Sequence, residues 1–550
     1  MTNSKIYLAR LTVEAASPLG IGSGRRGITT DRLVARDAYG LPYLPGTALA
    51  GCLRNSLSGQ LEDKVLNEVF GFQDNDEGIG SRLIISSGHL IGPDGKVVGE
   101  DNGLPTYEND YLKSLTEGSL PQRDHVRINS RGVADAKGHG KFDEQLVPRG
   151  VRFVFELCLH GTDDDADVWK QLVQEFCQPI FRIGGGTRKG FGKLSVKAIK
   201  QCILDLRNAE QLSAYLQLTS ALDAPLPSAF TTSIAPADAR QDDKWLTYEL
   251  RLTARDYFQF GRGIGGISES ASAVKDGWVS KLAKREPVVT WENGKPSLLS
   301  GDKACYLLPA TSLKGALSHR TAFHYNQLRK NYVEDQKIKE TSGPDYDSIV
   351  EDLMPVHSTL PKTPEEIKRE IERLMEFQST INEIDVDKSA TFRKFTEEID
   401  NAQTDEARPN VGENNDAVRA LFGFAVERQK DENGKDKSAQ RGRVLIDDVF
   451  LDSDEVQVKT FSHVMIDRFT GGAKAGALFN EDVARTKEKI VFTIQVEKTA
   501  FDGDNGDLIK NAFEEALLDL SRGQLPLGGG IAKGHGVFSG ELITPETQQV

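Results

Sequence analysis

The sequence has only five cysteines in 550 residues, and no two of them form a Cys-x-x-Cys pair. This scarcity argues against a structural zinc site and against a disulfide framework, so we expect most of the cysteines to be small buried residues. No apolar run approaches the ~20 residues that span a bilayer. Residues 1–5 also lack the apolar core of a signal peptide. We therefore expect a cytosolic protein with no membrane partner.

Two catalytic patterns are also missing. Neither glycine-rich loop ends in Gly-Lys-Ser/Thr, which disfavours a nucleotide hydrolase, and His, Asp and Ser show no triad-like spacing. The net charge of −14 argues against a nucleic-acid partner. Much of the acid, however, is concentrated at 326–416, and binding depends on the charge within a Debye length of about 8–10 Å. The composition therefore permits a nucleic-acid partner without indicating one.

Four sequence landmarks occur twice in the same order, which indicates a tandem duplication. They are Pro-Gly-Thr-Ala-Leu-Ala-Gly at 45–51 and Pro-Ala-Thr-Ser-Leu-Lys-Gly at 309–315, Phe-Gly-Phe at 70–72 and 422–424, His-Val-x-Ile at 125–128 and 463–466, and a triple glycine that enters a basic glycine loop at 184–192 and 528–536. Any function assigned to one copy must therefore be tested against the other.

Both copies predict the element order strand, helix, strand, strand, helix, strand. Alternating apolar residues predict an opening strand at 6–14, and Thr47 and Thr311 are predicted to cap the first helix of each copy. Leu49 and Leu53 would then face the core. This order is typical of the α+β ferredoxin-like fold, whose sheet also serves as an RNA-recognition platform.

The expected domains are a first unit at 1–204, a linker at 205–244 and a second unit at 245–550. The second unit carries a charged insertion at about 326–416, and the pattern at 363–377 predicts an amphipathic helix within it. We interpret the insertion as a surface elaboration rather than a catalytic unit.

The landmarks resemble the RAMP superfamily of CRISPR-associated proteins, and specifically the Cas-seven-type backbone subunit of type III effector complexes. The family pattern Asp-x-x-Val-x-Lys/Arg-Asp, followed by Pro-x-Ile-Pro-Gly-Ser-Ser-Leu-Lys-Gly, is similar to residues 31–37 and 41–47 here, and the terminal glycine-rich loop also carries the resemblance. A chain with two such units resembles the fused double backbone protein of type III-D variant complexes. The resemblance implies two tandem RRM-like RAMP domains with thumb hairpins, at 101–144 and around 463–481.

The resemblance further implies three partners: a guide RNA, a target RNA and other CRISPR-associated subunits. Glycines let backbone amides approach phosphate closely, and helix N-termini favour anions. The expected RNA-binding residues are Arg25, Arg26, Arg32, Thr47, Arg54, Gly185, Gly186, Arg188, Lys189, Ser312, Lys314, Gly529, Gly530, Lys533 and His535. The alternatives are tight turns at the glycine loops and simple capping at the helix starts.

Asp31 is the expected catalytic residue and metal ligand. In the family that it resembles, the matching aspartate is required for target-RNA cutting, with magnesium or manganese aiding attack by the ribose 2′-hydroxyl. The alternative is a turn-forming aspartate. The second copy departs from the pattern, because it has no aspartate at the position that matches Asp31. The loop aspartate nearest to that position is Asp276. We expect it to be either a second catalytic centre or an ordinary loop residue.

The expected function is metal-dependent endonucleolytic cleavage of target RNA paired to the bound guide. Two alternatives stay open, a non-catalytic guide-RNA scaffold and a guide-processing endoribonuclease. His125 and His463 recur at equivalent places, but a lone histidine before a strand is more often a structural or RNA-stacking residue than an acid–base catalyst.

Overall fold

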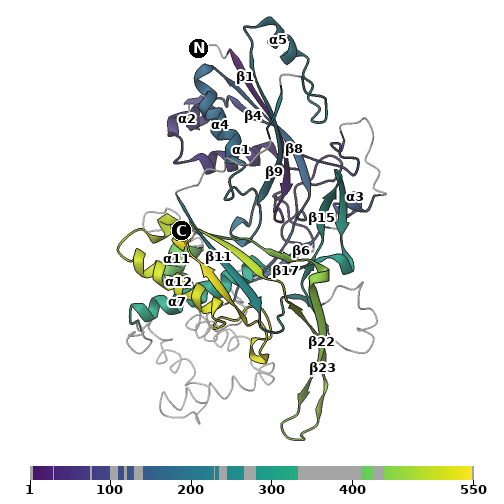
Figure 1. The fold of residues 1–550 in the computed structure, drawn as a ribbon, viewed down its shortest axis with the longest axis vertical. Helices are drawn as coiled ribbons and strands as arrows, with labels where there is room; N and C mark the ends of the chain where they lie inside the picture. Colours follow the sequence, from purple (N-terminus) through teal and green to yellow (C-terminus); the bar gives the residue numbers. More distant parts are fainter. Residues whose placement is uncertain are drawn as a thin grey trace, which may run out of the picture.

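Two sheets with the same strand order stand one above the other in the computed structural model (Figure 1). The structure describes residues 4–28, 30–74, 77–99, 109–116, 120–128, 140–227, 230–233, 244–264, 280–331, 410–424 and 439–547. Of the predicted insertion at 326–416, only the two ends fall in these ranges. The helix predicted at 363–377 lies outside the described residues.

The first sheet has the ferredoxin-like order β9-β1-β8-β4, and all of its neighbouring strands are antiparallel. Along the chain its elements are β1 (Lys5–Ala15), α1 (Gly46–Leu57), β4 (Leu83–Ile85), β8 (Arg152–Gly161), α4 (Ala166–Glu175) and β9 (Leu194–Asp205). Two short strands extend it, since β10 (Thr231–Ser233) pairs with β9 and β5 (His89–Leu90) pairs with β8. The predicted split β-α-β arrangement is confirmed here.

The second sheet repeats this order as β25-β11-β24-β20. Its elements along the chain are β11 (Trp245–Ala254), α7 (Ala310–Leu328), β20 (Val444–Ile446), β24 (Ile490–Glu497), α12 (Gly506–Ser521) and β25 (Phe538–Ile543). The sequence duplication is therefore a duplication of fold, and the α+β prediction is correct for both units.

Each unit has its own apolar core between the sheet and its helices. In the first unit, Leu49 and Leu53 of α1 pack with Leu11 and Val13 of β1, all of them fully or almost fully buried. The spacing of four residues on the helix and two on the strand produces this contact, because it places each apolar pair on one face.

The predicted threonine caps are wrong. Helix α1 begins at Gly46 after Pro45, and α7 begins at Ala310 after Pro309, with no capping bond from either N-cap side chain. At α7 the capping acceptor is a carboxylate that is distant in the sequence, because Asp448 Oδ1 accepts the Ala310 N–H at 2.8 Å. Thr47 therefore lies one residue inside its helix, and its side chain is exposed.

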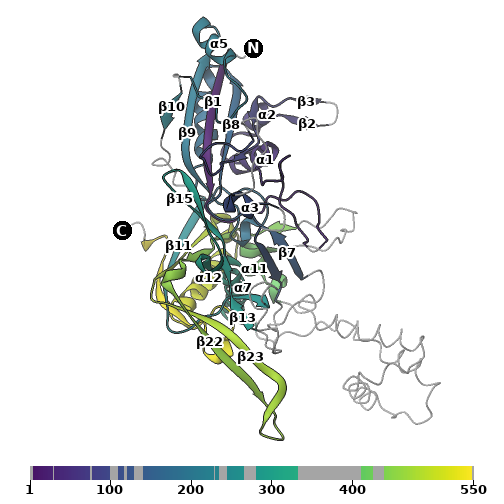
Figure 2. The ribbon, with the colours of Figure 1, turned by 90° about the vertical axis from the view of Figure 1, so that its right-hand side faces the viewer.

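A hairpin rises from each unit, as the thumb prediction requires. In the second unit, β22 (Val456–Ile466) and β23 (Ala473–Thr486) pair and project well beyond the sheet, as Figure 2 shows. In the first unit, β6 (Gln122–Val126) pairs with β7 (Lys141–Gln145), and residues 129–139 between them lie outside the described ranges.

Smaller elements complete the described fold. They are α2 (Asp63–Phe70), β2 (Phe72–Asp74), β3 (Glu77–Ile79), α3 (Asp110–Ser114), α5 (Ala209–Leu216), β12 (Gly261–Ile264), β13 (Ser280–Ala283), β14 (Arg285–Glu286), β15 (Val288–Glu292), β16 (Lys295–Leu299), β17 (Cys305–Leu308), α11 (Asp416–Phe422), β18 (Gly423–Phe424), β19 (Gln440–Arg441) and β21 (Val449–Leu451).

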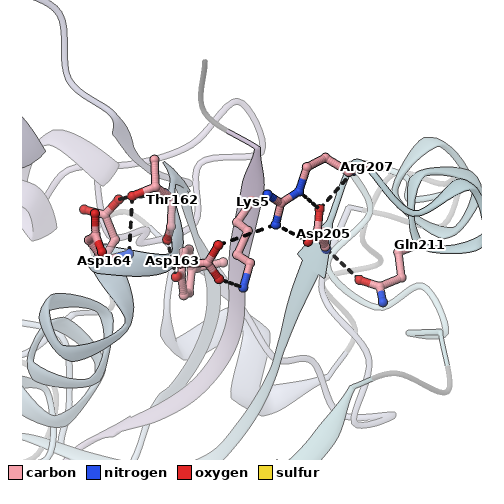
Figure 3. Close-up of polar contacts among 9 residues, drawn as sticks. Lys5, Thr162, Asp163, Asp164, Asp205, Arg207 and Gln211 are labelled. Atoms are coloured by element: carbon pink, nitrogen blue, oxygen red, sulfur yellow. Dashed lines mark hydrogen bonds and ion pairs between the residues drawn. The ribbon is translucent and has the colours of Figure 1, made fainter. Parts of the chain in front are cut away.

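At the far end of the first sheet, polar contacts attach α5 to the strand before it (Figure 3). Arg207 forms an ion pair with Asp205 at 2.6 Å, and Gln211 accepts the Asp205 N–H at 2.6 Å. Lys5 of β1 pairs with Asp163. This helix falls inside the segment predicted as a linker, and the domain limits 1–204, 205–244 and 245–550 stay a prediction.

The two units meet around one buried arginine. Arg123 of β6 is 2% exposed, and its Nη2 donates to Glu286 Oε2 of β14 at 2.7 Å. Its Nη1 lies 2.7 Å from Asp448 Oδ2, on the turn between β20 and β21. The neighbouring Asp447 pairs with Arg182 of the first unit at 2.8 Å. Charges from one unit thus neutralise charges from the other inside the contact.

We predict that Arg123→Met destabilises the protein by about 3–5 kcal/mol, because it leaves two buried carboxylates without their shared cation. Arg207→Met removes the same charge from an exposed pair that solvent screens, so it should destabilise the protein far less. Urea unfolding followed by tryptophan fluorescence compares the two variants. Equal midpoints for both would contradict the assigned role of Arg123.

Stability should also depend on pH through Asp448. Burial raises the pKa of its carboxyl to about 6 from 3.8, although Arg123 offsets part of this rise. Because the pKa is higher in the folded state, the protonated carboxyl contributes to folding stability. This contribution is complete below pH 3.8 and is lost as the pH rises through about 6. The wild type should therefore lose unfolding free energy across this window relative to Asp448→Asn. Parallel pH profiles of the two proteins would refute this.

Candidate nucleic-acid interface

The two glycine loops have the same backbone. A single 3-10 turn, Thr187–Lys189 in the first and Ile531–Lys533 in the second, follows a left-handed glycine in each. Gly186 has φ 68° and Gly530 has φ 71°. A Cβ atom at these positions would lie 2.4 Å from the Phe191 ring and 2.6 Å from the His535 ring. Both positions therefore require glycine for conformation and for space.

The loop amides are partly used within the protein. The Gly185 N–H donates to the Gly20 carbonyl at 2.8 Å, and the Gly529 N–H donates to the Gln259 carbonyl at 2.7 Å. These two hydrogen bonds hold each loop against the opening segment of its own unit. This is the arrangement expected if the loops are tight turns. A contact from the loops to RNA phosphate would then involve their cationic side chains, which are Arg188, Lys189 and Lys533.

In the first unit, the loop lysine joins a cluster at the base of the hairpin. Lys189 Nζ lies 3.1 Å from Glu144 Oε1, and His125 Nε2 lies 2.8 Å from the same oxygen. The Phe142 ring stacks on His125 with centroids 4.9 Å apart, and Lys189 Nζ is 4.2 Å from the Phe142 centroid. One carboxylate thus ties the glycine loop to both hairpin strands.

The second unit repeats this cluster. Lys533 pairs with Glu481, and His463 Nε2 lies 3.5 Å from Glu481 Oε2. Phe479 stacks on His463 at 5.1 Å, and Lys533 lies 5.3 Å from its centroid. We define each Lys-Glu-His-Phe set as the loop–hairpin cluster of its unit. The duplication has therefore preserved a side-chain arrangement as well as a fold.

The electrostatics of the first cluster favour a structural histidine. Burial lowers the pKa of His125, which favours the neutral imidazole. Burial alone would raise the pKa of Glu144, but His125 and Lys189 outweigh it and lower the pKa to about 2. Glu144 is thus an acceptor at any physiological pH. With its Nε2 2.8 Å from Glu144 Oε1, His125 suits an anchor of the loop.

Asp31 lies directly beside the first cluster. Its N–H donates to Asp143 Oδ1 at 2.7 Å, and the Asp143 N–H donates to Asp31 Oδ2 at 3.1 Å. The next residue, Arg32, lies 3.7 Å from Glu144 Oε2. The carboxylate of Asp31 is exposed. The structure therefore brings the sequence-predicted Asp31, Arg32 and Lys189 together at the foot of the β6–β7 hairpin.

The start of α7 in the second unit packs on the first glycine loop. A Cβ atom on Gly190 would lie 2.8 Å from the Ala310 Cβ, at the beginning of α7. One turn later, Lys314 is close enough to the loop that its pKa falls to about 8, through burial and through the charges of Arg188 and Lys189. At the matching Gly534, no described atom lies within 4 Å of such a Cβ.

Other predicted residues are dispersed. Arg25 and Arg26 are exposed in the opening glycine-rich stretch. Arg54 turns toward α2 and donates to the Gly71 carbonyl and to Asn67 Oδ1, both at 2.6 Å. Asp276 lies outside the described residues, so its role as a second centre stays a prediction.

Ser312 and His535 complete the predicted set. Ser312 is half-buried in the first turn of α7. His535 stacks on Phe461 of the second hairpin, with centroids 6.0 Å apart.

Sequence reasoning missed the glutamates and phenylalanines of the two clusters. The pattern Phe-x-Glu occurs at 142–144 and again at 479–481, after the repeated histidine in each copy. This recurrence was the available signal. Without coordinates, nothing indicates that the glutamate reaches a lysine 45 or 52 residues further along the chain.

We predict that Glu144→Ala raises amide hydrogen exchange in the loop at 184–192, because Lys189 and His125 lose their common acceptor. Glu481→Ala should do the same at 528–536. Each variant serves as the control for the other, since the distant loop should keep its wild-type exchange. Mass spectrometry of deuterated peptides measures both. Unchanged exchange at both loops would show that the glutamates do not anchor them.

The comparisons with known proteins agree with the duplicated fold. The family model of the RAMP superfamily matches residues 12–195 and 302–539, one region in each unit. A comparison with curated proteins gives no match. Within the described ranges, no helix is long and apolar enough to cross a membrane. With the family model covering both units, the chain belongs to the RAMP superfamily and is a CRISPR-associated, RNA-binding subunit.

Proposed function

We propose that the chain is a backbone subunit of a type III effector complex, of the fused double kind, which binds guide RNA and cleaves paired target RNA. The observation that carries this proposal is the exposed carboxylate of Asp31 beside the loop–hairpin cluster of the first unit. Both units place a lysine-bearing glycine loop at the foot of a hairpin, and only the first has a described aspartate of this kind there.

The second hairpin has the features of a wedge between bases. Phe469 is 93% exposed in the turn at its tip, and Met465 and Ile466 beside it are more than half exposed. Apolar side chains of this kind insert between base steps and kink a duplex, because stacking on the base repays their exposure to water. This supports the thumb role inferred from the family resemblance.

Asp31 and Asp143 fit a divalent cation. Each carboxylate uses one oxygen to accept the other residue's N–H, which leaves the second oxygen without a hydrogen bond among the described residues. Magnesium is commonly held by one or two carboxylates together with substrate phosphates. The described part of the chain holds no group of three or more His, Cys, Asp or Glu side chains placed for a metal. A bound magnesium or manganese ion would neutralise charge on the scissile phosphate.

The chain's own residues would orient the target strand and accept a proton. The hairpin foot holds the target strand near Asp31, and the ribose 2′-oxygen bonds to the adjacent phosphorus as the bond from phosphorus to the 5′-oxygen breaks. The Asp31 carboxylate accepts the 2′-hydroxyl proton, and the leaving 5′-oxygen takes a proton from water. His125 Nε2 lies 2.8 Å from Glu144 Oε1, so in this proposal the imidazole supports the hairpin foot.

We predict that Asp31→Asn in the assembled complex lowers target-RNA cleavage at one position by roughly 100-fold. Asparagine keeps an acceptor for the Asp143 N–H, so the local fold and the guide affinity should not change. Asp164→Asn, at an exposed site at the far end of the first sheet, serves as the control. Gel analysis of cleavage products and filter binding of guide RNA give the two readouts.

Three outcomes separate the proposal from its alternatives. Loss of one cut with intact guide binding supports target cleavage by this chain. Unchanged cutting at every position leaves the chain as a non-catalytic guide scaffold. Cleavage of free repeat RNA by the isolated chain favours a guide-processing enzyme instead.

A further inference from the structure

A cleft of about 730 Å³ lies between the two units, away from Asp31. One wall is formed by the second half of α1 and by the segment that leads into the first glycine loop. The opposite wall is formed by the start of β11 and by β19 with the residues that follow it. Side chains from both sequence repeats therefore face the same space.

The lining is strongly basic. Five cationic side chains border the cleft, against the single carboxylate of Glu497: Arg182, Arg188, Lys244, Arg441 and Arg443. Arg182 is neutralised by Asp447 at 2.8 Å. An excess of positive charge in a concave site concentrates anions there, because the protein walls limit screening by solvent.

Two of these arginines donate hydrogen bonds to neutral acceptors among the described residues. Arg188 Nε donates to the Gly442 carbonyl at 2.6 Å, and Arg441 Nη2 donates to Thr187 Oγ1 at 2.7 Å. Each arginine thus reaches across to the opposite unit. Burial, together with the charge of Arg441, lowers the pKa of Arg188 to about 9, and the carboxylate of Glu497 offsets only part of this fall. Two like charges held side by side in a cleft are stabilised by an anion placed between them.

An aromatic side chain stands in the same wall. Trp245 borders the cleft at the start of β11, and the Arg188 guanidinium lies 5.7 Å from its ring centroid. Arginine forks bind phosphate, and an indole ring provides an apolar surface for a base or ribose. The combination suits a nucleic-acid backbone better than it suits a free phosphate, which needs no aromatic surface.

We propose that this cleft binds phosphates of a single-stranded RNA segment, held by Arg188 from one unit and Arg441 from the other. The inference rests on the proposed RNA-binding function and extends it to Arg441, Trp245 and Asn55, which sequence reasoning did not select. RNA in the cleft would contact both units at once, so its binding would also stabilise their contact.

The test compares full-length Arg441→Gln with Arg207→Gln, which loses the same charge at the far end of the first sheet (Figure 3). Anisotropy of a labelled single-stranded RNA is measured over a range of KCl concentrations. Loss of one phosphate contact should reduce the slope of log K against log [KCl] by about 0.7 in magnitude, and the control should keep the wild-type slope.

A second pair of variants keeps every arginine in place. Asn55→Asp adds a carboxylate to the α1 wall of the cleft and should weaken RNA binding. Gln211→Glu adds the same charge in the region of Figure 3, keeps its acceptor for the Asp205 N–H, and should leave the affinity at its wild-type value.

The outcomes distinguish this inference from the proposed function. Weaker binding in both cleft variants, with both controls unchanged, supports the site. Wild-type affinity and slope in both cleft variants overturn the site but leave RNA binding by the chain intact. If the wild type itself fails to bind RNA, the proposed function fails and the cleft assignment falls with it.

Discussion

The arrangement of the two units depends on one guanidinium with two carboxylate partners. The Arg123 side chain projects from the first hairpin into the contact between the units, where it forms ion pairs with Glu286 and Asp448 of the second unit. Such a buried group tolerates little displacement, because any movement leaves an unpaired charge away from water. Asp448 also accepts the first N–H of α7. The same carboxylate therefore fixes the position of that helix relative to the first glycine loop.

Side-chain contacts link the contact between the two units to both candidate RNA-binding sites. Asp447, adjacent to Asp448, pairs with Arg182 and Lys193 of the first unit. Arg182 in turn borders the cleft that carries Arg188 and Arg441. On the other side, the Arg123 guanidinium lies 4.9 Å from the centroid of Phe191, at the end of the glycine loop. A change at the unit contact would thus alter both candidate RNA-binding surfaces.

The sequence predicted what depends on local periodicity and on repetition. Leu49 and Leu53 are buried as their spacing indicated, and both sheets have the expected strand order. Sequence-based prediction failed where two interacting groups are far apart in the chain, since Asp448 lies 138 residues from the amide that it caps. The same reason explains why Glu144 and Glu481 were missed. The sequence around a carboxylate does not show which cation it will pair with. The periodic spacing of apolar residues, in contrast, shows which face of a helix or strand will be buried.

The packing of Ala310 on Gly190 has a geometric consequence. In this contact, the start of α7 in the second unit covers the glycine loop of the first unit. The equivalent place at Gly534 has no described atom over it. The contact joins two different surfaces, so the two loops have different surroundings despite their shared backbone. Glycine at 190 is thus required both by space and by its φ of 95°, whereas among the described residues only the φ of 86° requires it at 534.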